Sequence, residues 1–410
     1  MASPSQAYLR LHSERVKHML GTRFAPWPSY TEEEAEAVRR ILLSNKVNYW
    51  TGDECRDFEA EFAKWSETRY AIALANGTVA LEASLRALDV GPGDEVIVTP
   101  RSFLASASCV INVGARPVFA DVERDSQNIS AATIARVLTK RTKAVICVHL
   151  AGWPCDMGPI MELAAEREFF VVEDCAQAHG ARYKGRPVGS IGHLGSWSFC
   201  QDKIITTGGE GGMITTNDRD LWARIWSYKD HGKSWSAVYE REHPPGFRWL
   251  HETIGTNWRM TEMQAAIGRI QLRRMPDWHA TRLSNATAIW SACSGLQGLR
   301  VPDVPEFVEH AAYKCYVFAE PTKLRRGWNR DRILESVNAS GVPCYTGSCP
   351  ELYLEKAFDN TASRPSERLP VARELGETSL MLLVHPTLTS SQIHQSCEVI
   401  RSVMREASSP

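Results

Sequence analysis

Between residues 70 and 216 the sequence alternates short apolar runs with longer stretches of helical periodicity, and this alternation is the strongest constraint on the fold. Strands that alternate with helices form a mostly parallel sheet covered by helices on both faces, and such sheets bind ligands at the carboxyl ends of their strands. We therefore expect an α/β fold with about seven strands in the main sheet. The expected strands are 71–75, 95–99, 117–122, 143–149, 169–172, 196–199 and 213–216.

Helical patterns flank this region on both sides. Thr31 followed by three glutamates predicts a helix start, because a hydroxyl cap and first-turn acids both suit the helix dipole. Phe58, Phe62 and Trp65 recur at helical spacing and predict an amphipathic helix with Glu59 and Glu61 facing outward. A long apolar helix face from 260 to 270 predicts a bridge to a second, smaller domain.

The chain is therefore expected to contain an N-terminal extension (1–30), a large ligand-binding domain (31–270) and a small C-terminal α+β domain (271–410). In the small domain, strands are predicted at 316–319, 343–346 and 380–384, and a last helix at 392–404. The segment from 226 to 258 is too long for a simple connection, which favours a functional role for it.

An acid and a lysine mark the central stretch of the sequence. The apolar run 169–172 ends in Glu173-Asp174, so Asp174 is expected at the carboxyl edge of the sheet. Lys203 follows, between Ser198 and the glycine-rich run 208–212. Lysine attacks carbonyls by forming a Schiff base, and pyridoxal phosphate is the cofactor that most often uses this reaction. That cofactor also needs an anion at its ring nitrogen and donors at its phosphate, roles open to Asp174 and Ser198.

A second anion site is predicted where the strand 71–75 meets the next helix. Gly77 and Thr78 lie at that helix start, where free backbone N–H groups and the positive end of the helix dipole coincide. An ordinary capped turn is the alternative interpretation of the same residues.

Composition excludes several classes of function. Lys plus Arg is 47 and Asp plus Glu is 48, with no long basic block, so nucleic acid is not an expected partner. The 11 cysteines are scattered and no signal peptide is recognised, which favours reduced thiols and a cytoplasmic location. No apolar run approaches the roughly 18 residues of a membrane span. His149, Cys147 and Cys155 lack a metal-ligand spacing, and the glycine run does not open a helix as dinucleotide sites do, so neither zinc nor NAD is expected.

Several motifs resemble the DegT/DnrJ/EryC1/StrS sugar aminotransferases, a family of fold-type I pyridoxal-phosphate enzymes. The similarity rests on EDCAQAHGA, SFCQDK and TTGGEGG in this order, and on the segments at 76–88, 91–103, 114–122 and 255–272. It covers roughly residues 30 to 400. Some members of the family are dehydratases with a histidine in place of the cofactor lysine, and Lys203 favours transamination instead.

The resemblance implies roles for individual residues. Lys203 would hold the cofactor and then act as the base of proton transfer, while Asp174 would pair with the ring nitrogen. Gln177 would lie against the ring, and Phe103 would stack on it. His179 is a weaker candidate for a nearby role, and His385 is expected to be structural.

The phosphate site implied by the family is shared between two subunits. Ser198, Gly77 and Thr78 would come from one chain, and Asn257 would reach the phosphate bound by the partner. A homodimer with shared active sites is therefore expected.

The implied reaction converts a keto group of a nucleotide-linked deoxysugar to an amine, with glutamate as donor, for bacterial polysaccharide or glycoconjugate biosynthesis. One alternative is an aminotransferase acting on a cyclitol or another ketone in secondary metabolism. Another, of a different class, is a catalytically silent relative that binds cofactor for regulation.

Overall fold

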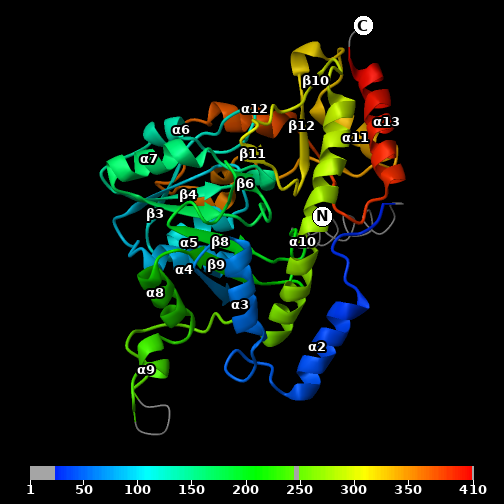
Figure 1. The fold of residues 1–410 in the computed structure, drawn as a ribbon. Coiled ribbons are helices and arrows are strands. Elements are labelled where there is room, and N and C mark those ends of the chain that lie inside the picture. The colour runs from blue at the N-terminus through cyan, green and yellow to red at the C-terminus, as the bar shows by residue number, and fades with distance from the viewer. Residues whose placement is uncertain (1–23, 244–248, 409–410) are drawn as a thin grey trace, which may run out of the picture.

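The computed structural model describes residues 24–243 and 249–408, and its largest sheet has seven strands in the order β1-β9-β8-β5-β4-β2-β3 (Figure 1). Strand β9 is antiparallel to both of its neighbours, while β8, β5, β4, β2 and β3 pair in parallel. The expected mostly parallel mixed sheet is confirmed, and each predicted run overlaps one strand. The strands are β1 (Tyr70–Leu74), β2 (Glu95–Val98), β3 (Arg116–Phe119), β4 (Thr142–Val148), β5 (Phe170–Asp174), β8 (Leu194–Ser198) and β9 (Gly212–Thr216).

Apolar cores lie on both faces of this sheet. In β1, Ile72 and Leu74 belong to one core cluster, whereas Ala71 and Ala73 belong to another, as alternation along a strand requires. Both faces are therefore covered. The helices of this region are α2 (Glu32–Ser44), α3 (Glu54–Trp65), α4 (Gly77–Ala87), α5 (Ala105–Asn112), α6 (Ala131–Ala135), α7 (Met157–Arg167) and α8 (Arg219–Lys229), with a short 3₁₀ turn, η1 (Leu150–Gly152).

A second, four-stranded antiparallel sheet has the order β10-β12-β14-β13. Its strands are β10 (Leu299–Arg300), β12 (Cys315–Ala319), β13 (Cys344–Tyr345) and β14 (Ser379–Leu382), and helices α11 (Arg330–Ala339), α12 (Pro370–Thr378) and α13 (Ser390–Ala407) accompany it. The three strands and the last helix predicted in this half are all present.

The 32-residue helix α10 (Glu262–Cys293) joins the two sheets (Figure 1). It contacts α2 and α3 near the large sheet, and β12 and α13 beside the small one. The predicted domain boundary at residue 270 falls inside this helix.

Part of the chain after α10 returns to the large sheet. Tyr353 and Phe358 pack edge-on against Phe119 of β3, with ring centroids 5.5 Å away in both cases. The turns η3 (Leu352–Leu354) and η4 (Lys356–Phe358) thus add apolar side chains to the core of the large sheet. The division into domains at 270 stays a prediction, and residues 1–23 of the predicted extension lie outside the described residues.

A small third sheet, β11-β6-β7, was not expected from the sequence. Each strand has two residues, Arg182–Tyr183 (β6), Arg186–Pro187 (β7) and Val308–Glu309 (β11), which is too short for an alternating pattern to show.

Helix α3 buries Phe58 and Phe62 as its pattern predicts, but the expected outward position of Glu59 is wrong. The Glu59 carboxylate accepts hydrogen bonds from the Ala73 backbone N–H (2.8 Å) and from Nζ of Lys229 (2.9 Å). The Lys229 side chain is fully buried. Glu59 therefore points inward to form an ion pair with a lysine that lies 170 residues later in the sequence.

The segment 226–258 contains the end of α8, the short helix α9 (Trp235–Tyr239) and two backbone pairings. Asp230 pairs with Asn257 and Lys233 with His251, both antiparallel. Helix α9 projects from the body of the molecule (Figure 1). In the same segment, Ile254 is strongly exposed. Among the described residues, no helix is long and apolar enough to cross a bilayer.

Candidate active site

A cavity of about 920 Å³ opens at the carboxyl ends of the large sheet, facing the small sheet. Seven of the eight site residues expected from the sequence line it: Gly77, Thr78, Phe103, Asp174, Gln177, Ser198 and Lys203. They come from the ends of β1, β2, β5 and β8 and from the loop after β8, because parallel strands deliver their carboxyl ends to one edge.

Lys203 lies in the turn between β8 and β9, with its side chain only 15% exposed. Its Nζ is 3.7 Å from Oδ1 of Asp202 and 5.2 Å from the ring centre of Tyr313. The Lys203 carbonyl accepts a 2.8 Å hydrogen bond from the indole N–H of Trp27, which fixes the backbone of the turn.

Asp174 ends β5 and is fully surrounded by protein apart from the cavity. Its carboxylate accepts hydrogen bonds from the Ser106 hydroxyl (3.0 Å) and from the Ala176 backbone N–H (3.2 Å). Burial raises the pKa of Asp174 above its ordinary value, although those two donors and the charge of Lys203 oppose the shift. A buried anion of this kind is stabilised by a cation placed in the cavity, as a protonated pyridine nitrogen would be.

Gly77 and Ser198 approach each other closely enough to require glycine. A Cβ on Gly77 would lie 2.5 Å from the Ser198 Cβ, so a larger residue would close this corner of the cavity. The Asn76 side chain caps α4 by accepting from the Val79 N–H, and the first helical N–H groups, those of Gly77 and Thr78, have no intrahelical acceptor. Backbone donors, two hydroxyls and a helix dipole thus converge where an anion the size of phosphate fits.

The other two predicted residues, Phe103 and Gln177, contribute an aromatic ring and a side-chain amide to the cavity. Phe103 is 71% exposed although it is a large apolar side chain, so its ring is available to stack on a planar ligand. Gln177 is buried, and its side-chain oxygen accepts a 2.8 Å hydrogen bond from the backbone N–H of Ala151 in η1. That bond directs the amide group of Gln177, which also lines the cavity.

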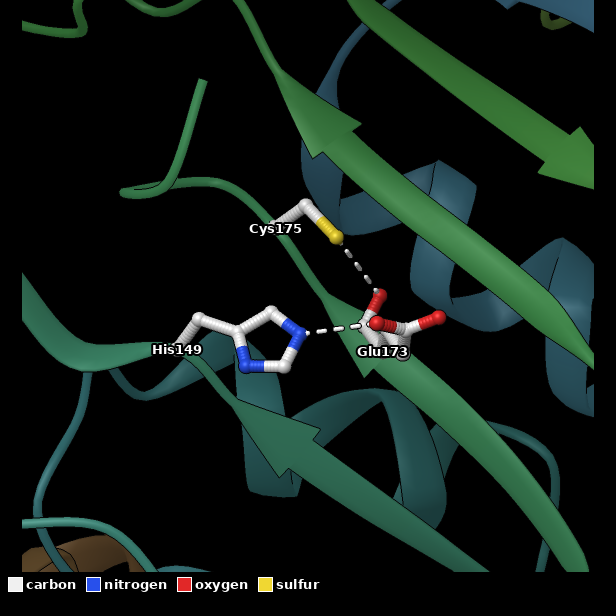
Figure 2. A group of neighbouring side chains, drawn as sticks. All are labelled: His149, Glu173 and Cys175. Atoms are coloured by element: carbon white, nitrogen blue, oxygen red, sulfur yellow. Dashed lines mark hydrogen bonds and ion pairs between the residues drawn. The ribbon is translucent and has the colours of Figure 1, made fainter. Parts of the chain in front are cut away.

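A buried polar cluster lies next to Asp174, at the ends of β4 and β5. Figure 2 shows His149 and Glu173 pointing toward each other from the ends of β4 and β5, 3.0 Å apart, with Cys175 beside them. Since Nδ1 of His149 accepts from the Cys155 N–H (3.0 Å), its Nε2 carries the proton and donates to Glu173. Glu173 also accepts three backbone N–H groups from residues 189–192.

The same three side chains bring a histidine nitrogen, a carboxylate and a thiol within 4.8 Å of one another. Their ligand atoms are already engaged, because Nε2 faces Glu173 and the Cys175 thiol donates to the Glu173 carbonyl. Burial, together with the charges of Glu173 and Asp174, holds the pKa of Cys175 far above its ordinary value, so no thiolate is available there. The cluster therefore supports the backbone of residues 189–192 through hydrogen bonds to Glu173.

Asn257 is the one predicted site residue that the structure does not bring to the cavity. It is exposed in the segment that pairs with Asp230. His179 also lies apart from the cavity lining, packed against Trp197 and Phe199, and burial lowers its pKa to about 3. His385 lines the cavity and is hydrogen-bonded to Thr387 at 2.8 Å.

Trp27, Asp202, Tyr313 and Lys314 are among the further lining residues to which the sequence assigned no individual role. Asp202 lies within the SFCQDK motif, so its position next to Lys203 was the available signal. Trp27 precedes α2, and Tyr313 and Lys314 precede β12 of the small sheet, where no local pattern points to a site.

A mixed sheet of this strand order, with its cavity at the carboxyl ends and one long helix leading to a small antiparallel sheet, defines the fold-type I class of pyridoxal-phosphate aminotransferases. The solved structure of an aminotransferase from Psychrobacter cryohalolentis is similar, with a TM-score of 0.92 and 61% identity over 93% of this chain and 99% of that one.

Protein relatives are similar over nearly their whole length. A GDP-perosamine synthase of Escherichia coli is 35% identical over 91% of this chain and 96% of its own length. A UDP-N-acetyl-3-dehydro-alpha-D-glucosamine 3-aminotransferase of Acidithiobacillus ferrooxidans is 34% identical over 94% of this chain and 96% of its own. The model of the DegT/DnrJ/EryC1/StrS aminotransferase family matches residues 28–401, and the chain belongs to this family.

Proposed function

We propose that this aminotransferase converts a keto group of a nucleotide-linked deoxysugar to an amine, with glutamate as donor, for polysaccharide or glycoconjugate biosynthesis. The observation that carries the proposal is that Lys203 and Asp174 line one cavity together with an open aromatic ring and an anion cradle. Two relatives whose names specify GDP-linked and UDP-linked amino sugars support the substrate class.

The residues of the cavity fit pyridoxal phosphate as cofactor. In this assignment Gly77, Thr78 and Ser198 bind the phosphate, Phe103 packs against the ring, and Asp174 pairs with the ring nitrogen. The bound cofactor supplies a ring that withdraws electrons from the carbon losing its proton. Because Asp174 is buried and already oriented by two donors, its charge can keep the ring nitrogen protonated.

Lys203 performs the proton transfer in this proposal. Its Nζ would hold the cofactor covalently in the resting enzyme. As a free amine, Lys203 would be the base that takes the proton from the α-carbon of the donor and the acid that supplies a proton to the carbon receiving the amino group. Asp202 and the Tyr313 ring confine Nζ on one side, so the amine is held at the reacting end of the cavity.

We further propose a homodimer in which Asn257 contacts the phosphate bound by the partner subunit. Support comes from the exposure of Asn257 and from the projecting segment that carries it, with exposed apolar side chains at Tyr239 and Ile254. An apolar surface of this kind suits an interface between two copies.

The decisive experiment is a panel of nucleotide-linked ketosugars with glutamate, scored by the mass of the product. Amination of at least one member is expected, with no product when glutamate is omitted. If no sugar reacts while a cyclitol ketone is aminated, the substrate class is wrong and the transaminase assignment stands.

A further inference from the structure

Two ammonium groups face the same aromatic ring in the cavity. The Nζ atoms of Lys203 and Lys314 lie 5.2 Å and 4.7 Å from the ring centre of Tyr313, and both side chains line the cavity. The Tyr313 hydroxyl donates to Oδ2 of Asp202, so this carboxylate is already hydrogen-bonded. In the proposed function Lys203 is taken by the cofactor, whereas Lys314 has no assigned task.

Positive charge exceeds negative charge at this end of the cavity. Besides the two lysines, the fully buried guanidinium of Arg282 lies behind the wall, 4.8 Å from the Trp27 ring centre. Asp202 is the carboxylate that acts on Lys314, and it is shared with Lys203. Three cations therefore interact electrostatically with the same carboxylate, and within residues 24–243 and 249–408 Lys314 has no hydrogen bond to an acceptor.

The electrostatics of Lys314 follow from this imbalance. Burial lowers its pKa to about 8, Asp202 opposes the shift, and the charges of Arg282 and Lys203 add to it. His385, which also lines this end, is neutral because burial and the charges of Arg282 and Lys314 lower its pKa to about 3. An anion that enters the cavity would replace the water that Lys314 has lost on burial. It would also offset the repulsion of Lys314 by Arg282 and Lys203.

This position is separate from the cofactor's phosphate cradle. Gly77 and Ser198 belong to α4 and β8 of the large sheet, whereas Lys314 immediately precedes β12 of the small sheet (Figure 1). Lys314 thus offers a second anion site in the same cavity, on a different element from the phosphate cradle.

We propose that Lys314 is a specificity-determining residue that binds an anionic oxygen group, a carboxylate or a phosphate, of a substrate held next to Lys203. The proposal rests on the proposed function. Two sources carry the required chemistry: a carboxylate of the amino donor, and the diphosphate of a nucleotide-linked acceptor. A lysine binds either one as a point charge through its three N–H donors.

The test compares Lys314→Met with Lys184→Met in the full-length, cofactor-loaded enzyme. Methionine keeps the unbranched stem and removes the charge. Lys184 is a matched control, because its Nζ also lies over a tyrosine ring, 5.2 Å from the centre of Tyr183, yet it is exposed and outside the cavity lining. Equal cofactor absorbance and equal melting temperatures would show that both variants fold and load.

Calorimetric titration with glutarate and with inorganic pyrophosphate then separates the two sources. Lys314→Met should bind one of these probes about 10- to 100-fold more weakly than the wild type, the loss typical of a charge-assisted hydrogen bond. Weaker binding of glutarate would mean that Lys314 binds a carboxylate of the amino donor. Weaker binding of pyrophosphate would mean that it binds the diphosphate of the acceptor. Lys314→Arg should restore part of the affinity, and Lys184→Met should match the wild type.

Unchanged affinity of Lys314→Met for both probes, or no binding of either probe by the wild type, would overturn the inference. Because the titration needs no turnover, its outcome is independent of the ketosugar panel. If the wild type aminates no sugar and Lys314→Met binds glutarate more weakly than the wild type, the proposed substrate is refuted and the anion site stands.

Discussion

At the scale of single residues, Asp174 shows how a site residue can be costly to the fold that carries it. Its pKa is raised by burial, and an acid with a raised folded-state pKa contributes stability below its unfolded pKa that is lost as pH rises through the folded one. The ionised form of Asp174 therefore destabilises the cofactor-free protein relative to the protonated form. A cation bound beside the Asp174 carboxylate would offset this cost.

Asp174→Asn should separate stability from activity. The amide keeps the shape and removes the buried charge, so the cofactor-free variant should unfold in urea at the same or a higher midpoint at pH 7.5. Transamination should fall by about 100-fold or more, because the ring nitrogen loses its counter-ion. A lower urea midpoint together with near-normal rates would contradict both parts of this prediction.

Sequence patterns revealed the residues that sit beside strand ends and missed those that approach from elsewhere. Asp174 follows an apolar run, Ser198 lies within a predicted strand, and Gly77 opens a helix, so each has a local signal. Lys314 and Tyr313 reach the cavity only because α10 and the small sheet fold back over the large one. Nothing in the residues around them encodes that approach.

At the scale of elements, the short segment before α2 connects the lysine turn to the small sheet. Trp27 donates to the Lys203 carbonyl and stacks on His385 at 6.0 Å, and the carbonyl of Pro26 accepts from Thr387. The sequence offered no role for this segment, since proline and tryptophan without periodicity predict neither helix nor strand.

Trp27→Phe tests whether this hydrogen bond positions Lys203. Phenylalanine keeps an aromatic ring and removes the N–H, which costs about 1 kcal/mol for one neutral hydrogen bond. We expect kcat to fall about threefold to tenfold and the pH at which the bound cofactor changes absorbance to shift, with KM for the donor little changed. Trp235→Phe, in the projecting helix α9, is the control and should leave that spectroscopic titration as in the wild type.

Helix α3 and helix α8 are joined by the buried ion pair of Glu59 and Lys229. Lys229→Met would leave the Glu59 carboxylate without its cation, and breaking a buried pair costs about 3–5 kcal/mol. The free energy of unfolding in urea should fall by that amount. Lys323→Met removes a lysine that is paired with Glu320 at an exposed position, and it should change stability by less than about 1 kcal/mol.

The same pair explains why the sequence misplaced Glu59. Its spacing from Phe58 and Phe62 places it beside the apolar face of the helix, and a glutamate there is ordinarily solvated. Only the later segment that supplies Lys229 makes the position a buried one, and a helical pattern cannot report a partner 170 residues away.

At the scale of the whole molecule, the α/β architecture was predictable from the alternation of strands and helices, whereas the proposed second subunit was expected only from the family resemblance. Asn257 carries no local signal, because its proposed task lies on another chain. In one chain it is an exposed residue in a backbone pairing with Asp230.

Mixing two inactive variants tests the shared site. Lys203→Ala removes the proton-transferring amine, and Asn257→Asp places a negative charge against the partner's phosphate. In a heterodimer one site carries both changes and the other carries neither. After unfolding and refolding together, random pairing should restore about a quarter of wild-type activity. No recovery, with each variant still dimeric by light scattering, would refute the shared site.

The return of the chain from the small sheet to the large one has a consequence for biosynthesis. Phe119 is covered by Tyr353 and Phe358, and Leu375 belongs to the same core. The roughly 250 residues between Phe119 and Leu375 take about 12 to 50 s to translate at ordinary rates. During that time we expect the nascent large sheet to present an uncovered apolar edge, which favours aggregation until the last third of the chain leaves the ribosome.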